Sequence, residues 1–160
     1  MKIKKVIINL LILASCYQFE AIADDLIGQS LGAQTTNSLP GPTDVFLITC
    51  PSNESGVPAY LTVSLKDETP SMANAGIMSL QIQKGSQAVS VTDATGGNSA
   101  YSKAIQLWPV ERSTSIGTGD YLVFVNKGMS PARVYSLTYW CVTEAGIHTS
   151  GANILTLQNQ

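Results

Sequence analysis

From residue 44 onward, short runs of strand-forming residues alternate with clusters of turn-forming residues. In 60–65, Leu61, Val63 and Leu65 are separated by single residues, which is the period of two that a half-buried strand requires. We expect strands near 44–50, 60–65, 78–83, 89–91, 101–108, 121–125, 133–142 and 154–157. About eight short strands at this spacing predict an all-β fold, a single antiparallel β-sandwich of jelly-roll or immunoglobulin-like type.

Length and charge narrow the classes of protein to which this domain can belong. A chain of 160 residues has room for one domain. Lys and Arg number 9 against 11 Asp and Glu, so a basic footprint for nucleic acid is excluded. The single histidine excludes most enzymes that need a histidine cluster.

The first 23 residues have the pattern of a bacterial secretory signal peptide. A cationic start, 1–5, precedes an apolar run at 6–14, and 21–23 reads Ala-Ile-Ala, a cleavage site with small residues at −3 and −1. The apolar run is too short for a transmembrane span, so we expect none in the mature chain. Cleavage after Ala23 removes three cations and one anion, which changes the formal net charge from −2 to −4.

A second interpretation of the leader stays open. Residues 13–16, Leu-Ala-Ser-Cys, also resemble a bacterial lipobox, in which Cys16 is lipidated and becomes the first residue. The two interpretations predict either a free extracellular or periplasmic protein or a membrane-anchored lipoprotein.

Cys50 and Cys141 remain in the mature chain under either interpretation. Export places them where disulfides persist, and two cysteines allow one pairing. The long closed loop corresponds to about 4.5 kcal/mol of stabilisation in the chain-entropy model. We therefore expect a bridge that joins an early strand to a late one.

Residues 24–43 separate the leader from the strand-rich region. They are rich in Gly, Thr, Ser, Gln and Asn and sustain neither a helical nor a strand period. We interpret them as a flexible arm or linker before a β-sandwich domain at 44–160.

Aromatic residues are the best candidates for a binding site. Flat rings with a polar edge are the usual means by which a sandwich holds sugar rings. Strand alternation places Trp140 on the opposite face from Tyr139 and Cys141, so Trp140 points outward if those two face the core. The tentative ligand-binding residues are Tyr60, Tyr101, Trp108 and Trp140. The alternative is that the tryptophans only cover the edge of the sandwich.

Other chemistry has weaker support. His148 lies in a small-residue segment and is expected to be an exposed or hydrogen-bonded loop residue. Carboxylates at Asp67, Glu68, Asp93 and Asp120 could contribute to a calcium site, but no calcium-loop spacing is present. We expect no metal site, no cofactor and no catalytic residue, since the serines lack a nucleophile-elbow motif.

The segment 119–125, Gly-Asp-Tyr-Leu-Val-Phe-Val, followed by Tyr-Ser-Leu at 135–137 and Asp-Val-Phe at 44–46, resembles bacterial pre-peptidase C-terminal domains. That resemblance implies a small secreted β-sandwich of the kind appended to exported enzymes, which assists binding or secretion. The chain departs from the pattern by carrying the cysteine pair and no catalytic domain.

These observations favour a non-catalytic, exported module that binds a glycan or a protein at the cell surface or in the periplasm. The alternative is a structural subunit that self-associates into an extracellular layer, sheath or filament. In that case 24–42 would add a strand to the sheet edge of a neighbour. Nucleic acid is not an expected partner.

Overall fold

The computed structural model describes residues 24–33, 41–70, 77–93, 100–109, 117–128 and 131–160. The expected leader, including Cys16, lies outside these residues. The described residues form ten strands and no helix, so none of them belongs to a helix that could cross a membrane. The strands are β1 (Asp24–Leu31), β2 (Thr43–Cys50), β3 (Tyr60–Asp67), β4 (Met78–Lys84), β5 (Gln87–Asp93), β6 (Ile105–Leu107), β7 (Gly119–Lys127), β8 (Arg133–Val142), β9 (His148–Thr149) and β10 (Asn153–Gln158).

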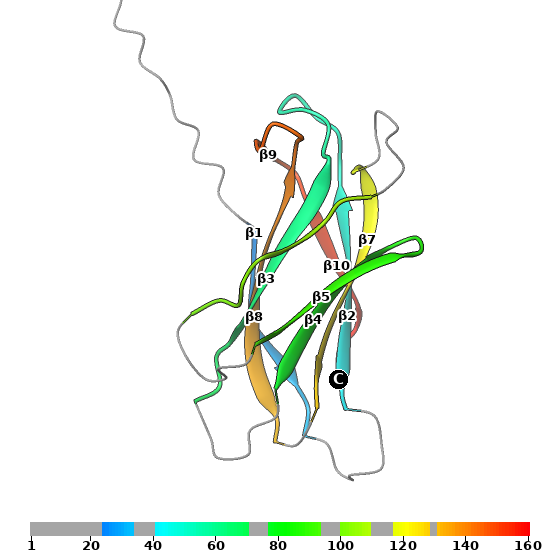
Figure 1. Cartoon of the computed structure of the whole chain (residues 1–160). Helices are drawn as coiled ribbons and strands as arrows, with labels where there is room; N and C mark the ends of the chain where they lie inside the picture. Colours follow the sequence, from blue (N-terminus) through cyan, green and yellow to red (C-terminus); the bar gives the residue numbers. More distant parts are fainter. Residues whose placement is uncertain (1–23, 34–40, 71–76, 94–99, 110–116, 129–130) are drawn as a thin grey trace, which may run out of the picture.

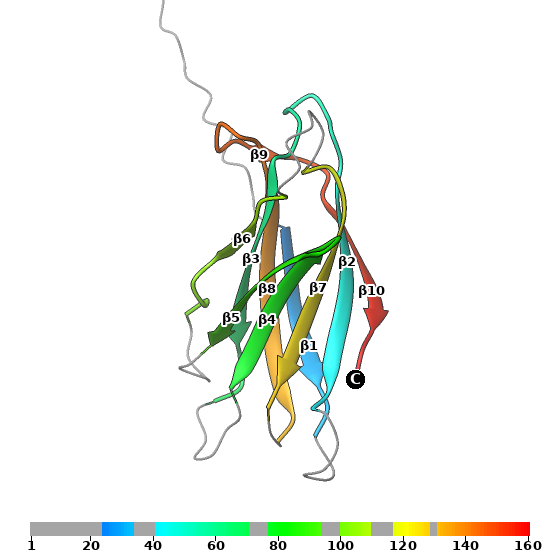
Figure 2. The same ribbon diagram turned by 45° about the vertical axis from the view of Figure 1, so that its right-hand side comes forward.

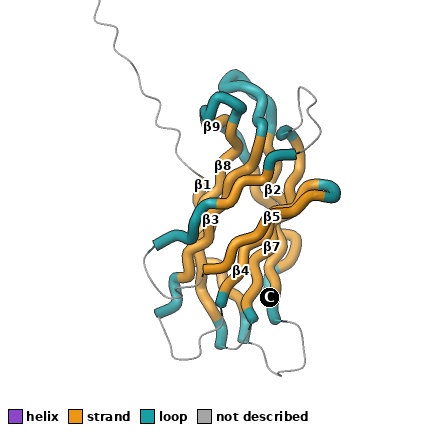
Figure 3. The backbone as a smooth tube through the Cα atoms, viewed as in Figure 1, coloured by secondary structure: helices purple, strands orange, loops and turns teal. Residues whose placement is uncertain are grey.

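Two antiparallel sheets face each other (Figure 1). Sheet A has the order β1-β8-β3-β6, with β9 also paired to β8, and sheet B has the order β10-β2-β7-β4-β5. Figure 2 shows β6 of sheet A and β5 of sheet B on the same side of the molecule. Figure 3 shows that strands make up most of the described chain. The prediction of an all-β fold with antiparallel sheets is confirmed.

Alternating side chains build the core between the sheets. In β2, Phe46, Ile48 and Cys50 are fully buried while the residues between them are half-exposed. The same alternation runs through β4 and β7, as expected for strands with one face on a core. The inner face of sheet A is supplied by Leu61, Val63, Leu65, Tyr135, Leu137, Tyr139 and Cys141.

The strand count is higher than the sequence predicted. The two additional strands are β1 and the short β9, and β6 covers only 105–107 of the expected 101–108. Both additional strands pair with β8. Neither has a sustained apolar alternation, because their pairing is made by backbone groups at a sheet edge, which leave no pattern in the side chains.

A flexible arm was expected at 24–43, and the structure corrects this expectation for residues 24–31. They form β1, which is registered against β8 from Asp24↔Tyr139 to Leu31↔Arg133. A bulge between Leu26 and Gln29, with Gly28 at φ 70°, interrupts the alternation that sequence reasoning required. Leu31 is fully buried and fixes the end of the strand in the core. Residues 34–40 lie outside the described part of the chain.

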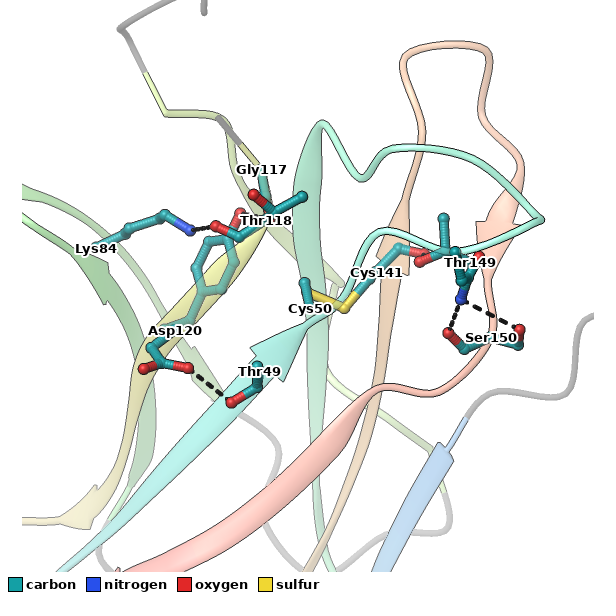
Figure 4. Close-up of a disulfide and its surroundings, with 11 residues drawn as sticks. Thr49, Cys50, Lys84, Gly117, Thr118, Asp120, Cys141, Thr149 and Ser150 are labelled. Carbon is teal, nitrogen blue, oxygen red and sulfur yellow. Dashed lines mark hydrogen bonds between the residues drawn. A yellow bond between two sulfur atoms is a disulfide. The ribbon is translucent and has the colours of Figure 1, made fainter. Parts of the chain in front are cut away.

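One end of the sandwich carries the predicted disulfide. Cys50, the last residue of β2, bonds to Cys141 of β8 across the core, with 5.7 Å between their Cα atoms (Figure 4). Nearby, the Thr49 hydroxyl donates to the Asp120 carboxylate over 2.7 Å. The bridge joins sheet B to sheet A, so the prediction that an early strand is linked to a late one is confirmed.

The opposite end of the sandwich buries polar side chains. The Tyr135 hydroxyl of β8 donates to Asp44 of β2 over 2.6 Å, and the backbone N–H of Gln160 donates to the same carboxylate over 2.7 Å. Arg133 and Asp67 form an ion pair of 2.9 Å, with both side chains 1% exposed. Burying such groups is unfavourable unless they are paired, so these contacts hold that end in one arrangement.

Candidate functional site

The outer face of sheet A gathers the aromatic residues singled out above. Leu61 and Val63 of β3 point into the core, so Tyr60 and Thr62 lie on the other face of the sheet. The register pairs Thr62 with Trp140 on β8 and with Gln106 on β6. Side chains from three adjacent strands therefore meet on this face.

Tyr60 and Trp108 form a stacked pair. Their ring centroids are 4.0 Å apart, and the planes of the rings differ by 23°. Tyr60 is only 8% exposed whereas Trp108 is 47% exposed, so the tryptophan covers the tyrosine and presents its own outer surface to solvent. The Trp108 indole N–H donates to the Gln106 side chain over 3.4 Å, which fixes the direction of the ring.

Trp140 packs against His148. Their ring centroids are 5.4 Å apart, with an interplanar angle of 31°. His148 reaches this position because β9 pairs with the end of β8 in the register Val142↔His148. A tight turn precedes β9, in which the Thr143 N–H donates to the Ile147 carbonyl over 2.8 Å. The expectation of a loop histidine is therefore wrong: His148 is a half-buried strand residue.

Two buried polar atoms on this face have no hydrogen-bond partner within the described residues. They are the Thr62 hydroxyl and Nδ1 of His148. Thr62 is 1% exposed because its neighbours on both adjacent strands cover it. A buried polar group without a partner is unfavourable and is rare in folded proteins, so these two atoms mark the face as unusual.

We call the set Tyr60, Thr62, Trp108, Trp140 and His148 the aromatic strip. Tyr60 pairs with Val142 and is thus diagonal to Trp140, a spacing of about 7–8 Å between Cα atoms. The strip runs across β9, β8 and β3 to Trp108, which directly follows β6. Its side chains include no carboxylate, ammonium or guanidinium group.

Tyr101 lies apart from the aromatic strip. Its segment continues the edge of β3 beyond β6, since the Ser102 N–H donates to the Leu65 carbonyl over 2.6 Å. Its ring lies 5.9 Å from the Lys66 ammonium, roughly 20 Å along β3 from Tyr60. Burial raises the pKa of the Tyr101 hydroxyl, with smaller contributions from nearby acids.

The half of the face beside Tyr101 is polar. Lys66 and Glu68 form an ion pair of 2.9 Å, and the Ser136 hydroxyl donates to Glu68 over 2.9 Å. The hydrogen bonds from Lys66 and Ser136 lower the pKa of Glu68. The outer face of sheet A therefore has a charged half and an uncharged aromatic half.

The carboxylates considered for calcium are engaged in other contacts. Asp67 accepts a hydrogen bond from the Thr69 backbone N–H and pairs with Arg133, Asp120 accepts from the Thr49 hydroxyl, and Asp93 is buried. Among residues 24–160, excluding the undescribed gaps, no three His, Cys, Asp or Glu side chains form a group that could hold a metal.

Sequence reasoning named Tyr60, Trp108 and Trp140 but missed Thr62 and His148 as members of the same site. Thr62 has the pattern of any alternating strand residue, and His148 belongs to a two-residue strand that carries no detectable signal. Comparison of the chain with protein-family models, with curated proteins and with solved structures finds no match.

Proposed function

We propose that this protein is a non-catalytic, exported module that binds a glycan through the aromatic strip on the outer face of sheet A. The observation that carries the proposal is the meeting of two aromatic pairs, Tyr60–Trp108 and Trp140–His148, around Thr62 on one sheet face. We assign the domain to the jelly-roll or immunoglobulin-like sandwiches as part of this proposal.

The chemistry of the strip suits a sugar chain. Sugar rings present flat C–H surfaces and a rim of hydroxyl groups. The exposed surface of Trp108 offers an apolar plane, and the exposed side-chain amide of Gln106 offers a hydrogen-bonding group beside it. Because the Trp108 ring already stacks on Tyr60 and donates to Gln106, part of the cost in side-chain entropy is met before a ligand binds. The absence of charged side chains from the strip favours a neutral ligand over an anionic one.

The proposed site of action is the cell surface or the periplasm. The leader at 1–23 and the disulfide both suit export to an oxidising compartment. If Cys16 were lipidated instead, only residues 17–23 would separate the anchor from β1, a reach of about 25 Å. The anchored alternative would thus hold the sandwich close to the membrane.

Retention on polysaccharides tests the proposal. The oxidised 24–160 protein would be assayed by affinity electrophoresis on soluble glycans and by pull-down on peptidoglycan, chitin and cellulose. We expect Trp108→Ala and Trp140→Ala each to weaken retention at least about tenfold, which is the loss of one good contact. Val134→Ala is the matched control, because Val134 is exposed on β8 about 20 Å from Trp140.

The controls separate binding from stability. The two tryptophan variants should keep their melting temperature within a few degrees, since both side chains lie outside the core. If the parent protein is retained on none of the glycans, or if Val134→Ala weakens retention as strongly, the glycan proposal is wrong. Binding to a protein partner instead would also overturn it.

A structural subunit that self-assembles through residues 24–42 is the second candidate. Its support is that β1 lies at the edge of sheet A and has mostly exposed side chains, so an exchange of β1 between copies would uncover little core. The test is a lock between β1 and β8, made by replacing the paired residues Asp25 and Thr138 with cysteine. A locked monomer that still assembles contradicts strand exchange.

A further inference from the structure

Apart from the two-residue β9, the two sheets have four edge strands among the described residues, and three of them are protected against pairing with another chain. In sheet A, β1 carries Asp24 and Asp25 and a bulge at Gly28, while β6 is three residues long and is followed by Pro109. In sheet B, β5 lies beside β6 and ends in the buried Asp93 (Figure 2). Charges, bulges, short strands and prolines are the usual means of blocking edge-to-edge pairing.

The fourth edge strand, β10, has little such protection. Its sequence, Asn-Ile-Leu-Thr-Leu-Gln, contains no charge and no proline. It pairs regularly with β2 over residues 153–156, and its only bulge follows Thr156. Leu155 and Leu157 are 54% and 51% exposed. The edge of β10 thus offers both backbone groups and two large exposed apolar side chains to a partner strand.

An apolar stripe on the outer face of sheet B runs out to this edge. The register joins Leu155 to Leu47 and Leu47 to Leu122, one strand after another. Val45 and Phe124 form the adjacent row. All four side chains on β2 and β7 are half-exposed, since they alternate with fully buried residues.

We infer that β10 is a dimerisation edge, at which it pairs antiparallel with β10 of a second copy of this chain. An antiparallel strand pair is compatible with a two-fold axis, so one uncharged edge can serve as both partners. Two mature chains of net charge −4 repel each other, yet neither β10 nor the outward residues of β2 carry a charge. A charged partner strand would find no opposite charge on β10. A second copy of β10 is equally uncharged and can pair with it without leaving a charge unpaired.

Pairing of this kind would extend sheet B across both copies. The two-fold axis of an antiparallel pair is perpendicular to the sheet, so the apolar stripes of the two copies become one surface. The outer faces of both copies of sheet A then point in the same direction. This second consequence rests on the proposed function: two aromatic strips facing one way would bind a repetitive glycan with avidity, although the dimer itself does not depend on glycan binding.

The experiment measures the association of the oxidised 24–160 protein by sedimentation equilibrium. We expect a reversible dimer, and we expect Leu155→Lys to raise its dissociation constant at least about tenfold, since the charge enters the seam twice. Ile27→Lys is the matched control, because Ile27 is an apolar residue on the protected edge strand β1 and is even more exposed than Leu155, at 71% against 54%. This control should leave the dissociation constant unchanged.

Hydrogen exchange supplies a test without mutation. As the protein concentration rises, amides in 153–157 should exchange more slowly, while amides in 24–31 should not change. A protein that stays monomeric to ~1 mM overturns the inference, because its association is then weaker than any specific dimer of interest. A dimer that Leu155→Lys leaves intact, or one that protects β1, overturns it equally. Trp108→Ala should not affect association, so failure of the glycan proposal is a separate result.

Discussion

The same two strands, β2 and β8, are joined across the core at both ends, by different chemistry. At one end Cys50 bonds covalently to Cys141, and at the other Asp44 accepts a hydrogen bond from Tyr135. On each strand the two positions are six residues apart, so β2 and β8 lie parallel to each other in opposite sheets. The disulfide end is cross-linked by two small side chains, whereas the polar end relies on buried charge and on the chain terminus.

The comparison shows that two sheets can be held together by a covalent bond at one end and by buried hydrogen bonds at the other. A disulfide stabilises mainly by restricting the unfolded chain and depends on the redox state of the compartment. A buried carboxylate with two donors stabilises by satisfying groups that have lost water, and it responds to pH. The two ends should therefore respond to different perturbations.

Removal of the disulfide is the strongest test of this comparison. The paired variant Cys50→Ala, Cys141→Ala should lose about 4 kcal/mol of unfolding free energy, because the loop it opens spans 91 residues of separation. Urea unfolding with and without reductant measures the loss, and reductant should not affect the variant. A loss below about 1 kcal/mol would show that the polar end alone holds β2 to β8.

Loss of the buried ion pair tests the polar end. Arg133→Met removes the partner of Asp67 and should cost about 3 kcal/mol, since an uncompensated carboxylate stays buried. Replacing both residues, with Asp67→Asn added to Arg133→Met, should recover part of the loss. If the double variant is no more stable than the single one, the pair does not act as a unit.

Removing the Tyr135 hydroxyl is a milder change at the same end. Tyr135→Phe should cost about 2 kcal/mol, because a hydrogen bond to a buried carboxylate is lost while the packing of the ring remains. Thermal unfolding at neutral pH measures it. Tyr121→Phe is the control, since the Tyr121 hydroxyl is also buried but donates only to the Gly117 carbonyl.

The pH dependence of Asp44 separates the two ends further. Burial raises the pKa of Asp44 above its ordinary 3.8, and the hydrogen bonds from Tyr135 and Gln160 offset this only in part. An acid with a raised folded-state pKa binds a proton more readily when folded, so its contribution to stability is lost as the pH rises through the interval above 3.8. The difference in unfolding free energy between the parent protein and Asp44→Asn should thus decrease from about pH 3 to pH 6. A difference that grows over this range contradicts the assignment.

The smallest effect is expected for an exposed ion pair with the same separation as the buried one. Lys66 and Glu68 lie 2.9 Å apart, as do Arg133 and Asp67, but water screens the first pair. Lys66→Ala should change the unfolding free energy by less than about 0.5 kcal/mol. A larger loss in chemical denaturation would mean that the polar half of the face is better ordered than its exposure suggests.

Most of the strands were predictable because a buried face imposes a period of two. The strand expected at 133–142 coincides with β8, and the cysteine pairing followed from the presence of two cysteines outside the leader. β1 and β9 were missed because edge pairing is made by the backbone, and the bulge at Gly28 breaks what alternation there is. The separation of Tyr101 from Trp108 was missed as well. The sequence predicted one strand over 101–108, whereas β6 pairs with β3 only over 105–107 and leaves Tyr101 outside it.

The amino-acid sequence by itself determined the all-β class, the placement of Trp140 on the opposite strand face from Tyr139 and Cys141, and the one disulfide possible between the two cysteines outside the leader, because each depends on local alternation or on counting. Only the tertiary structure decided that Tyr60 stacks on Trp108, that His148 packs on Trp140, and that β10 is an edge strand of sheet B. These features join residues from different strands, and their positions depend on strand order. Strand order follows from how all the apolar faces pack together, which no single segment encodes.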